Sequence, residues 1–155
     1  MILIEIYTDG SCKGNGTKAA QGGFGIVVYE NGVIIDAYSE MLDAVTNNQM
    51  ELKAILWAQE KYGNCLNPPT VYSDSAYCVN TFNNWMAGWK KKGWLKSDNR
   101  SPENLDLIKR YDMNETIGRK INLVKVKGHA ASEGNNLADA LATGRITIGE
   151  LKDGR

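Results

Sequence analysis

Four carboxylates of this chain lie within or beside apolar segments, where a negative charge is unfavourable. They are Asp9, Glu51, Asp74 and Asp139. Burial of an ionised carboxylate costs free energy unless a hydrogen-bonding partner or a metal ion compensates it, and acidic side chains are rarely fully buried without such a partner. The four positions therefore predict a fold that brings them to one shared cation site.

Length, charge and cysteine content narrow the class of protein. The chain has 155 residues, which favours one domain with a substantial core, and its 18 basic and 18 acidic residues cancel. Binding to a polyanion would therefore need a local basic patch. Cys12, Cys65 and Cys78 are odd in number and lack C-x-x-C spacing, which disfavours a disulfide framework or zinc site and favours a reducing, cytoplasmic setting. No segment resembles a signal peptide or a membrane span.

The first forty residues predict a meander of three strands. Residues 2–9 are rich in β-branched and apolar side chains and precede a glycine, so they predict a buried strand that ends at Asp9. Residues 23–29 and 33–39 predict two further strands. They flank Asn31-Gly32, a pair that tolerates the positive φ angles of a tight hairpin turn.

A helix is predicted from about Gln49 to Tyr62. Thr46 and its neighbours supply N-cap side chains, and Gly63 follows the last turn. At about 100° per residue, Glu51 falls inside the apolar arc of this helix. Two interpretations remain open: Glu51 faces the sheet and binds a metal, or it lies at the boundary, where it caps the first turn or reaches solvent.

The rest of the chain continues a mixed α/β order. Residues 70–74 predict a short strand that ends at Asp74, and residues 120–126 predict another. Ser101-Pro102 predicts the start of the helix between them, because proline favours the first helical position. The last helix is predicted over residues 135–142.

The predicted elements can bring the carboxylates together. Asp9 and Asp74 would meet at one edge of the sheet if their strands are neighbours, and Glu51 would approach from the covering helix. Ligands that are all oxygen favour Mg²⁺ or Mn²⁺, while the lack of soft ligands disfavours zinc. A single aspartate at a strand end more often completes a turn, so the metal hypothesis depends on the motifs around all four.

Those motifs occur in a recognisable order. They are YTDGSCKGN at 7–15, TNNQMEL at 46–52, YSDS at 72–75, and VKGH at 126–129 followed by GNNLAD at 134–139. In this order and spacing the chain resembles type 1 ribonuclease H, the endonuclease that cuts the RNA strand of RNA/DNA hybrids. The resemblance implies an α/β ribonuclease H-like fold, a five-stranded mixed sheet of order 3-2-1-4-5 flanked by helices. The catalytic domain is expected over residues 1–142, followed by a C-terminal tail, residues 143–155.

The resemblance also implies catalytic roles. Asp9, Glu51, Asp74 and Asp139 match the metal-binding carboxylates of the family, which hold two Mg²⁺ ions when substrate is bound; Mn²⁺ can substitute. The expected products carry 5′-phosphate and 3′-hydroxyl ends. Asp139 is expected to be the most mobile ligand. His129, the only histidine, matches a loop histidine with a role in proton transfer or product release.

Contacts with the DNA strand are expected in residues 84–96, which interleave three tryptophans with four lysines. This segment resembles the basic protrusion of the family, and lysines with aromatic side chains are suited to tracking a phosphate backbone. The alternative is a solvated helix face with tryptophans packed on the core. The candidates are Trp85, Trp89, Lys90, Lys91, Lys92 and Trp94.

A second set of contacts is expected in the minor groove of the hybrid, where 2′-hydroxyls distinguish RNA from DNA. Thr46 matches a position that grips a DNA phosphate. Ala76 and Gln49 depart from the residues found in some members, so contacts at those two positions are not carried over. The minor-groove candidates are Cys12, Asn15, Asn47 and Asn48, of which Asn47 and Asn48 also suit helix capping.

Three other functions fit the sequence less well. Gly14-x-Gly16-x-x-Ala19 matches a dinucleotide-binding pattern, but a hairpin follows where a helix is required. A non-catalytic hybrid-binding module would not set four carboxylates against a polyanion. Integrases and junction nucleases share the fold without the tryptophan–lysine protrusion. We therefore expect a monomeric, cytoplasmic enzyme that is a free protein and not a domain of a reverse transcriptase. It is expected to lack an N-terminal hybrid-binding domain and to remove RNA primers or R-loops.

Overall fold

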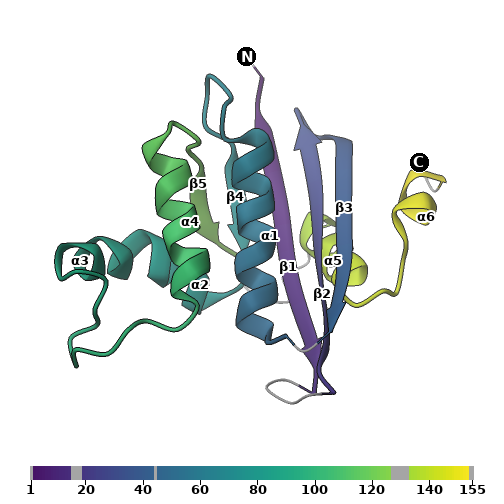
Figure 1. The fold of residues 1–155 in the computed structure, drawn as a ribbon. Helices are drawn as coiled ribbons and strands as arrows, with labels where there is room; N and C mark the ends of the chain where they lie inside the picture. The colour runs from purple at the N-terminus through teal and green to yellow at the C-terminus, as the bar shows by residue number, and fades with distance from the viewer. Residues whose placement is uncertain (1, 15–18, 44, 127–132, 154–155) are drawn as a thin grey trace.

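A five-stranded mixed sheet organises the chain (Figure 1). The fold is that of a computed structural model, which describes residues 2–14, 19–43, 45–126 and 133–153. The strands are β1 (Ile4–Lys13), β2 (Gln21–Glu30), β3 (Val33–Asp43), β4 (Thr70–Ser73) and β5 (Asn122–Lys125). Their order is β3-β2-β1-β4-β5, with β1, β2 and β3 antiparallel and β4 and β5 parallel to β1. The predicted sheet order is confirmed.

Helices cover both faces of this sheet. They are α1 (Asn47–Tyr62), α2 (Ala76–Asn80), the π-helix η1 (Thr81–Trp85), α3 (Met86–Lys91), α4 (Leu105–Thr116), α5 (Glu133–Ala142) and α6 (Ile148–Asp153). Helices α1 and α4 pack side by side on one face, and α5 lies on the other (Figure 1). Helix α3 and the loop after it project away from the sheet (Figure 1).

The turn between β2 and β3 confirms the hairpin prediction. Asn31 and Gly32 have φ angles of 49° and 84°, which most other residues adopt only at a cost. The Asn31 side chain also accepts a hydrogen bond from the backbone of Leu3 at 2.7 Å. The turn is thereby tied to the start of β1.

Strand β1 continues past Asp9, so the predicted strand end is wrong. Gly10 to Lys13 pair with Phe24 to Gln21 of β2 in antiparallel register. Gly10 is required by helix packing instead of by a turn, because a Cβ atom there would lie only 2.4 Å from the backbone nitrogen of Glu51. The absence of a side chain at Gly10 thus lets α1 approach the strand that carries Asp9.

Helix α4 begins at Leu105, so the predicted start at Ser101-Pro102 is also wrong. The residue before it, Asn104, has a φ of 58° and donates to the Tyr77 hydroxyl at 3.2 Å. This tertiary contact holds the preceding loop and overrides the local start signal. Helices α1 and α5 each begin two residues earlier than predicted.

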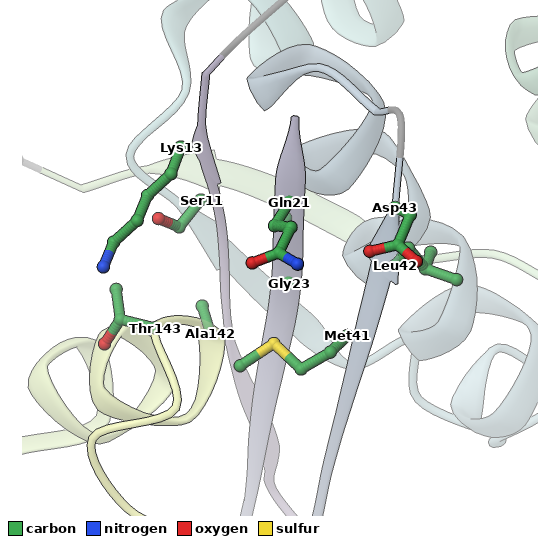
Figure 2. A pocket seen from close by; sticks show the side chains of 10 residues that line it. Ser11, Lys13, Gln21, Gly23, Met41, Leu42, Asp43, Ala142 and Thr143 are labelled. Atoms are coloured by element: carbon green, nitrogen blue, oxygen red, sulfur yellow. The ribbon is translucent and has the colours of Figure 1, made fainter. Parts of the chain in front are cut away.

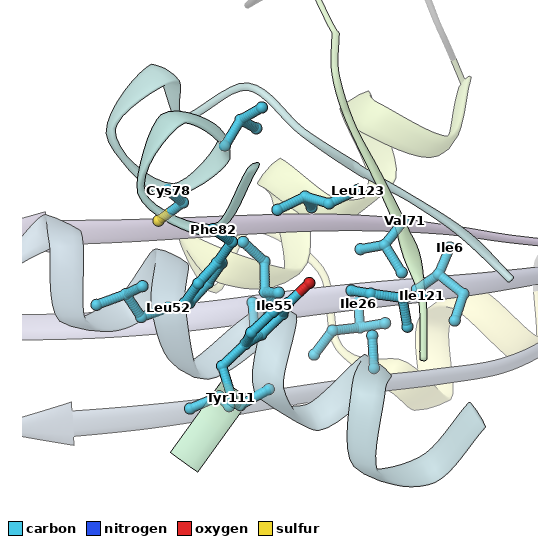
Figure 3. Close-up of a cluster of buried hydrophobic side chains, with 14 of the residues drawn as sticks. Ile6, Ile26, Leu52, Ile55, Val71, Cys78, Phe82, Tyr111, Ile121 and Leu123 are labelled. Carbon is cyan, nitrogen blue, oxygen red and sulfur yellow. The ribbon is translucent and has the colours of Figure 1, made fainter. Parts of the chain in front are cut away.

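The larger core lies between the sheet and α1, α2 and α4 (Figure 3). The rings of Phe82 and Tyr111 stack at 3.8 Å within it. A smaller core on the opposite face packs α5 against β2 and β3, and Leu151 of α6 is buried there. The segment after α5 therefore contributes a side chain to the core.

A buried polar network joins α1 to α4. Gln59 is fully buried, and its side-chain amide donates to the backbone oxygens of Tyr111 at 3.1 Å and Arg119 at 3.3 Å. Its own oxygen accepts from Asn114 at 3.0 Å. Since a buried amide is stable only when its hydrogen bonds are made, this network fixes how α1, and hence Glu51, lies against the molecule.

Candidate active site

Three of the predicted carboxylates converge at one edge of the sheet. Asp9 lies within β1, Asp74 directly follows β4, and Glu51 comes from the first turns of α1. β1 and β4 pair in parallel with Tyr7 beside Tyr72, so Asp9 and Asp74 occupy equivalent places two residues further along. One carboxylate oxygen of each of the three residues lies within 4.8 Å of the others.

Glu51 faces the sheet, so the boundary interpretation of its position is wrong, while metal binding stays a prediction. The residue is 7% exposed, and its Oε1 accepts a hydrogen bond from the backbone nitrogen of Gly10 at 3.0 Å. Its Oε2 is buried and has no hydrogen-bond partner among the described residues. An unpaired buried carboxylate oxygen is unfavourable, and a cation held with Asp9 and Asp74 would satisfy it.

The electrostatics of the cluster favour a cation. Burial, followed by repulsion from the Glu51 charge, raises the pKa of Asp9 well above its usual value. Burial and then the Asp74 charge raise the pKa of Glu51. Charged carboxylates packed together repel one another, and desolvation strengthens this effect. A hard divalent cation would reverse it, because it supplies the opposing charge and accepts oxygen ligands.

Asp139 reaches the edge of this group from α5. Its carboxyl group lies close enough to that of Asp9 to contribute to the raised pKa of Asp9, and its Oδ2 is ion-paired with the guanidinium of Arg145. The Asp139 side chain is 39% exposed, in contrast to Asp9 and Glu51. Asp139 is therefore placed beside the three converging carboxylates and is held partly by another partner.

Sequence reasoning missed Arg145. Gly144, with a φ of 75°, ends α5, and the backbone nitrogens of Gly144 and Arg145 donate to Leu141 at 3.3 Å and Ala140 at 2.9 Å. This is the glycine-ended turn that closes many helices, and it directs the Arg145 side chain back over the last turn. The glycine directly after a helix that carries a carboxylate was the available signal.

The minor-groove candidates that can be described flank the N-terminus of α1. The Thr46 hydroxyl accepts from the backbone nitrogen of Gln49 at 3.2 Å, and the Gln49 side chain accepts in return from Thr46 at 2.9 Å. Asn47 and Asn48 form the first turn, about one turn before Glu51. Cys12 donates to the backbone oxygen of Val45 at 3.1 Å. Asn15 and His129 lie outside the described residues.

The candidates in the tryptophan–lysine segment separate into two environments. Trp85, Trp89 and Lys92 line a cavity of about 540 Å³ on α3 and the loop after it. Trp85 is 44% exposed, and its ring lies 6.0 Å from that of Trp89. Trp85 and Lys92 are exposed, while Trp89 is partly buried and also packs against the core, so the three form an aromatic and basic surface that is open at Trp85 and Lys92.

Of the other members of the segment, Lys90 and Trp94 contact the rest of the protein, and Lys91 has no ion pair with a described residue. Lys90 pairs with Asp112 at 3.0 Å, and the Trp94 ring packs against the core with the Lys109 ammonium 5.7 Å from its centre. Lys91 is exposed on the last turn of α3. The segment thus combines core packing with a basic surface.

The fold and the site together define a class of protein. A mixed sheet of order 3-2-1-4-5, with carboxylates from two neighbouring parallel strands and a covering helix, is the arrangement of a metal-dependent nuclease of the ribonuclease H-like fold. No helix in the described part of the chain is long and apolar enough to span a bilayer.

Comparison with known proteins identifies the family. The RNase H family model matches residues 3–147. The ribonuclease H of Caldanaerobacter subterraneus subsp. tengcongensis is 41% identical over 148 residues, which cover 93% of this chain and 91% of that protein. The chain belongs to the ribonuclease H family and is similar to its bacterial type 1 members.

Solved structures agree with this assignment. LC9-RNase H1, a type 1 RNase H with the type 2 active-site motif, is 28% identical, with a TM-score of 0.77 over 96% of this chain and 73% of that one. A foamy viral protease-reverse transcriptase in complex with RNA/DNA hybrid is 26% identical, with a TM-score of 0.80 over 91% of this chain and 19% of that one.

Proposed function

We propose that this protein cuts the RNA strand of RNA/DNA hybrids by two-metal-ion hydrolysis at the carboxylate cluster, leaving 5′-phosphate and 3′-hydroxyl ends. Family membership supports the substrate, since one similar structure holds an RNA/DNA hybrid. The observation that carries the chemistry is the buried, unpaired Oε2 of Glu51, which lies with Asp9 and Asp74 in a group able to hold a metal ion.

The residues present suit two hard divalent cations. Asp9, Glu51 and Asp74 would hold one ion, and Asp9 with Asp139 would hold the other. Mg²⁺ is the proposed ion and Mn²⁺ a substitute, because both prefer oxygen ligands. When bound, such a pair activates a water molecule and stabilises the leaving oxygen of an in-line displacement.

The protein side chains would prepare this site in distinct ways. The Gly10 backbone orients Glu51 through the 3.0 Å hydrogen bond to Oε1, which leaves Oε2 for the ion. Asp9 is fixed in the middle of a long paired strand. Asp139 is more exposed and paired with Arg145, so it would join last, when substrate is bound. His129 would assist proton transfer or product release.

Substrate would be held at two places. Trp85, Trp89 and Lys92 form an open surface suited to the DNA backbone; Lys90, Lys91 and Trp94 would support it. Cys12, Asn15, Asn47 and Asn48 would contact the minor groove. Among the described residues the Thr46 hydroxyl only accepts, in the helix cap, so its proton would be available for a DNA phosphate.

Domain bounds, oligomeric state and cellular location complete the proposal. Residues 1–142 would form the catalytic domain, and residues 143–155 the tail. We propose a monomer that acts in the cytoplasm on RNA primers or R-loops.

One cleavage assay tests the proposal. End-labelled RNA/DNA hybrid, RNA/RNA, DNA/DNA and single-stranded RNA are each incubated with Mg²⁺ or with chelator. Cutting restricted to the RNA of the hybrid, dependent on metal and leaving 5′-phosphate ends, is the expected result. Equal cutting of RNA/RNA, or full activity in chelator, would overturn it.

Two variants test the metal site within the same assay. Asp9→Asn and Glu51→Gln should each abolish cutting while hybrid binding persists. Glu103→Gln is the matched control, because Glu103 is an exposed carboxylate on the loop before α4. Unchanged cutting by Asp9→Asn or Glu51→Gln would refute the two-metal mechanism.

A further inference from the structure

We infer that a cavity beside Asp139 binds a phosphate of the RNA strand being cut, through the ammonium group of Lys13. This inference rests on the proposed function and adds a contact on the face of β1 opposite to Cys12. The cavity has a volume of about 460 Å³ and lies where the ends of β1, β2 and β3 meet the end of α5. Lys13, Ser11 and Thr143 gather on one side of it, with Asp43 on the far side (Figure 2).

The cavity lies further along the two elements that carry Asp9 and Asp139, and its lining begins two residues beyond Asp9 and three beyond Asp139. Side chains alternate along a strand, so Asp9, Ser11 and Lys13 project from the same face of β1. On α5, Asp139 and Thr143 are four residues apart and share one side of the helix. The two elements that carry Asp9 and Asp139 therefore also form the near wall of the cavity.

The close packing of α5 on β2 forms one border of the cavity. A Cβ atom at Gly23 would lie 2.4 Å from the backbone oxygen of Ala142, so no side chain can stand at that position without moving α5. Both residues line the cavity. The Met41 sulfur would lie equally close to that Cβ atom, at 2.4 Å, so both the backbone of α5 and the Met41 side chain close on β2 at Gly23.

Lys13 supplies the charge for a phosphate. The residue is exposed and forms no ion pair with any other residue that the structure describes. Ser11 adds a hydroxyl on the same wall. Lysine commonly binds phosphate as a flexible point charge, so an unpaired lysine beside a nuclease site is suited to the backbone of the strand that enters it.

Other groups limit the phosphate to the Lys13 side. The Thr143 hydroxyl already accepts from the Arg145 side chain at 2.9 Å and donates to the backbone oxygen of Asp139 at 3.0 Å. Asp43 lines the opposite wall, and the carbonyl end of α5 carries partial negative charge. An anion is therefore favoured next to Lys13 and Ser11 and disfavoured deeper in the cavity.

The RNA strand is the expected occupant because it must cross the carboxylates. Along β1, Lys13 is four residues beyond Asp9, roughly 13 Å at the usual rise. Phosphates follow one another at roughly 3.4 Å of helix rise per strand, so the contacted phosphate lies within roughly four nucleotides of the cut. Lys13 is thus a positioning residue, outside the bond-breaking step.

The test compares Lys13→Gln, Lys13→Arg and Lys120→Gln with the unmodified protein. Lys120 is exposed and precedes β5, at the end of the parallel strands away from the carboxylates. The measured quantity is kcat/KM for hybrid cleavage across a salt series. In a plot of log kcat/KM against log salt concentration, the line for Lys13→Gln should be less steep by about 0.7–0.9. The ratio of kcat/KM for the unmodified protein to kcat/KM for Lys13→Gln should therefore fall about threefold between about 50 and 200 mM salt. The kcat of Lys13→Gln should stay within about twofold.

Lys13→Arg should restore the slope, since it restores the charge, and Lys120→Gln should leave it unchanged. A slope for Lys13→Gln equal to that of the unmodified protein would overturn the inference. Matching thermal melts of the variants would exclude a folding defect. If the unmodified protein cuts no hybrid, the proposed function itself fails, which is a different outcome.

A second measurement locates the contacted phosphate. Single methylphosphonates, which lack the negative charge, are placed along either strand of a short hybrid with one dominant cut site. One RNA position within roughly four nucleotides of the cut should weaken binding to the unmodified protein and have no effect on Lys13→Gln. The same profile in both proteins would overturn the inference, and loss of sensitivity at a DNA position would overturn the assignment to the RNA strand.

Discussion

The guanidinium of Arg145 folds back over the end of α5 and pairs with the carboxylate of Asp139. The side chains are 61% and 39% exposed, so the pair belongs to the class of surface ion pairs that contribute about 0.2–1 kcal/mol. Little free energy is needed to break such a pair. In this protein a bound metal ion would replace the Arg145 guanidinium as the partner of the Asp139 carboxylate.

Arg145→Gln should therefore lower the Mg²⁺ concentration needed for half-maximal cleavage, because Asp139 no longer has to leave its partner. The expected shift is about 1.5- to 5-fold, the ratio that corresponds to about 0.2–1 kcal/mol. A Mg²⁺ titration of cleavage measures it, with Arg145→Lys as the control that keeps the charge. A higher Mg²⁺ requirement in Arg145→Gln would show instead that Arg145 positions Asp139 for the metal.

Asp9→Asn should stabilise the metal-free protein while it abolishes cleavage. Burial and then the Glu51 charge raise the pKa of Asp9 far above its usual 3.8. The folded state thus binds a proton that the unfolded state releases, and stability falls as pH rises above about 4 and on through neutral pH. At pH 7 the variant should be more stable by about 1–3 kcal/mol.

Thermal melts in chelator from about pH 5 to 8 measure this dependence. The melting temperature of the unmodified protein should fall with rising pH more steeply than that of Asp9→Asn. Added Mg²⁺ should recover the loss in the unmodified protein alone. Parallel pH profiles for the two proteins would contradict the assigned cause.

Gln59→Leu should destabilise the fold by about 1–3 kcal/mol, since it removes the amide that satisfies the Tyr111 and Arg119 carbonyls. Urea unfolding measures the change. Met113→Ala is the control on the same helix pair, because Met113 is 61% exposed and should cost less than about 0.5 kcal/mol. Equal midpoints for the two variants would mean that the network adds little to stability.

Replacing Lys90, Lys91 and Lys92 together by alanine should weaken hybrid binding and flatten its salt dependence. Among single variants, Lys92→Ala should have a larger effect than Lys90→Ala. Lys92 lines the open cavity beside Trp85 and Trp89, while Lys90 is already paired with Asp112. Binding titrations at several salt concentrations measure both. An unchanged salt slope in the triple variant would make these lysines a solvated helix face.

Local sequence signals predicted those parts of the fold that short-range chemistry determines. The Asn31-Gly32 turn needs only its own φ angles, and the end of β4, one residue before the predicted end at Asp74, is marked by the chain around it. The burial of Glu51 followed from helical periodicity, although the choice between core and boundary needed the neighbouring strand. The order of the strands came from the family resemblance of the motifs.

The errors have a common physical origin in long-range contacts. Gly10 was interpreted as a turn because nothing nearby in the sequence shows that α1 packs on it. The start of α4 depends on Asn104 meeting Tyr77, 27 residues away. In both cases the deciding partner lies far along the chain. The missed Arg145–Asp139 pair is different, because it is local and depends on the turn at Gly144.

The missing side chain at Gly10 has a consequence for ion size. It brings the backbones of α1 and β1 into direct contact. The separation of Glu51 from Asp9 is therefore set by main-chain packing, which deforms less easily than flexible side chains. Mg²⁺ binds oxygen at about 2.0–2.1 Å and Ca²⁺ at about 2.3–2.6 Å. Both ions accept the same ligands. Selection between them at this site would depend on the separation of Glu51 and Asp9, which is fixed because Gly10 has only a hydrogen atom as its side chain.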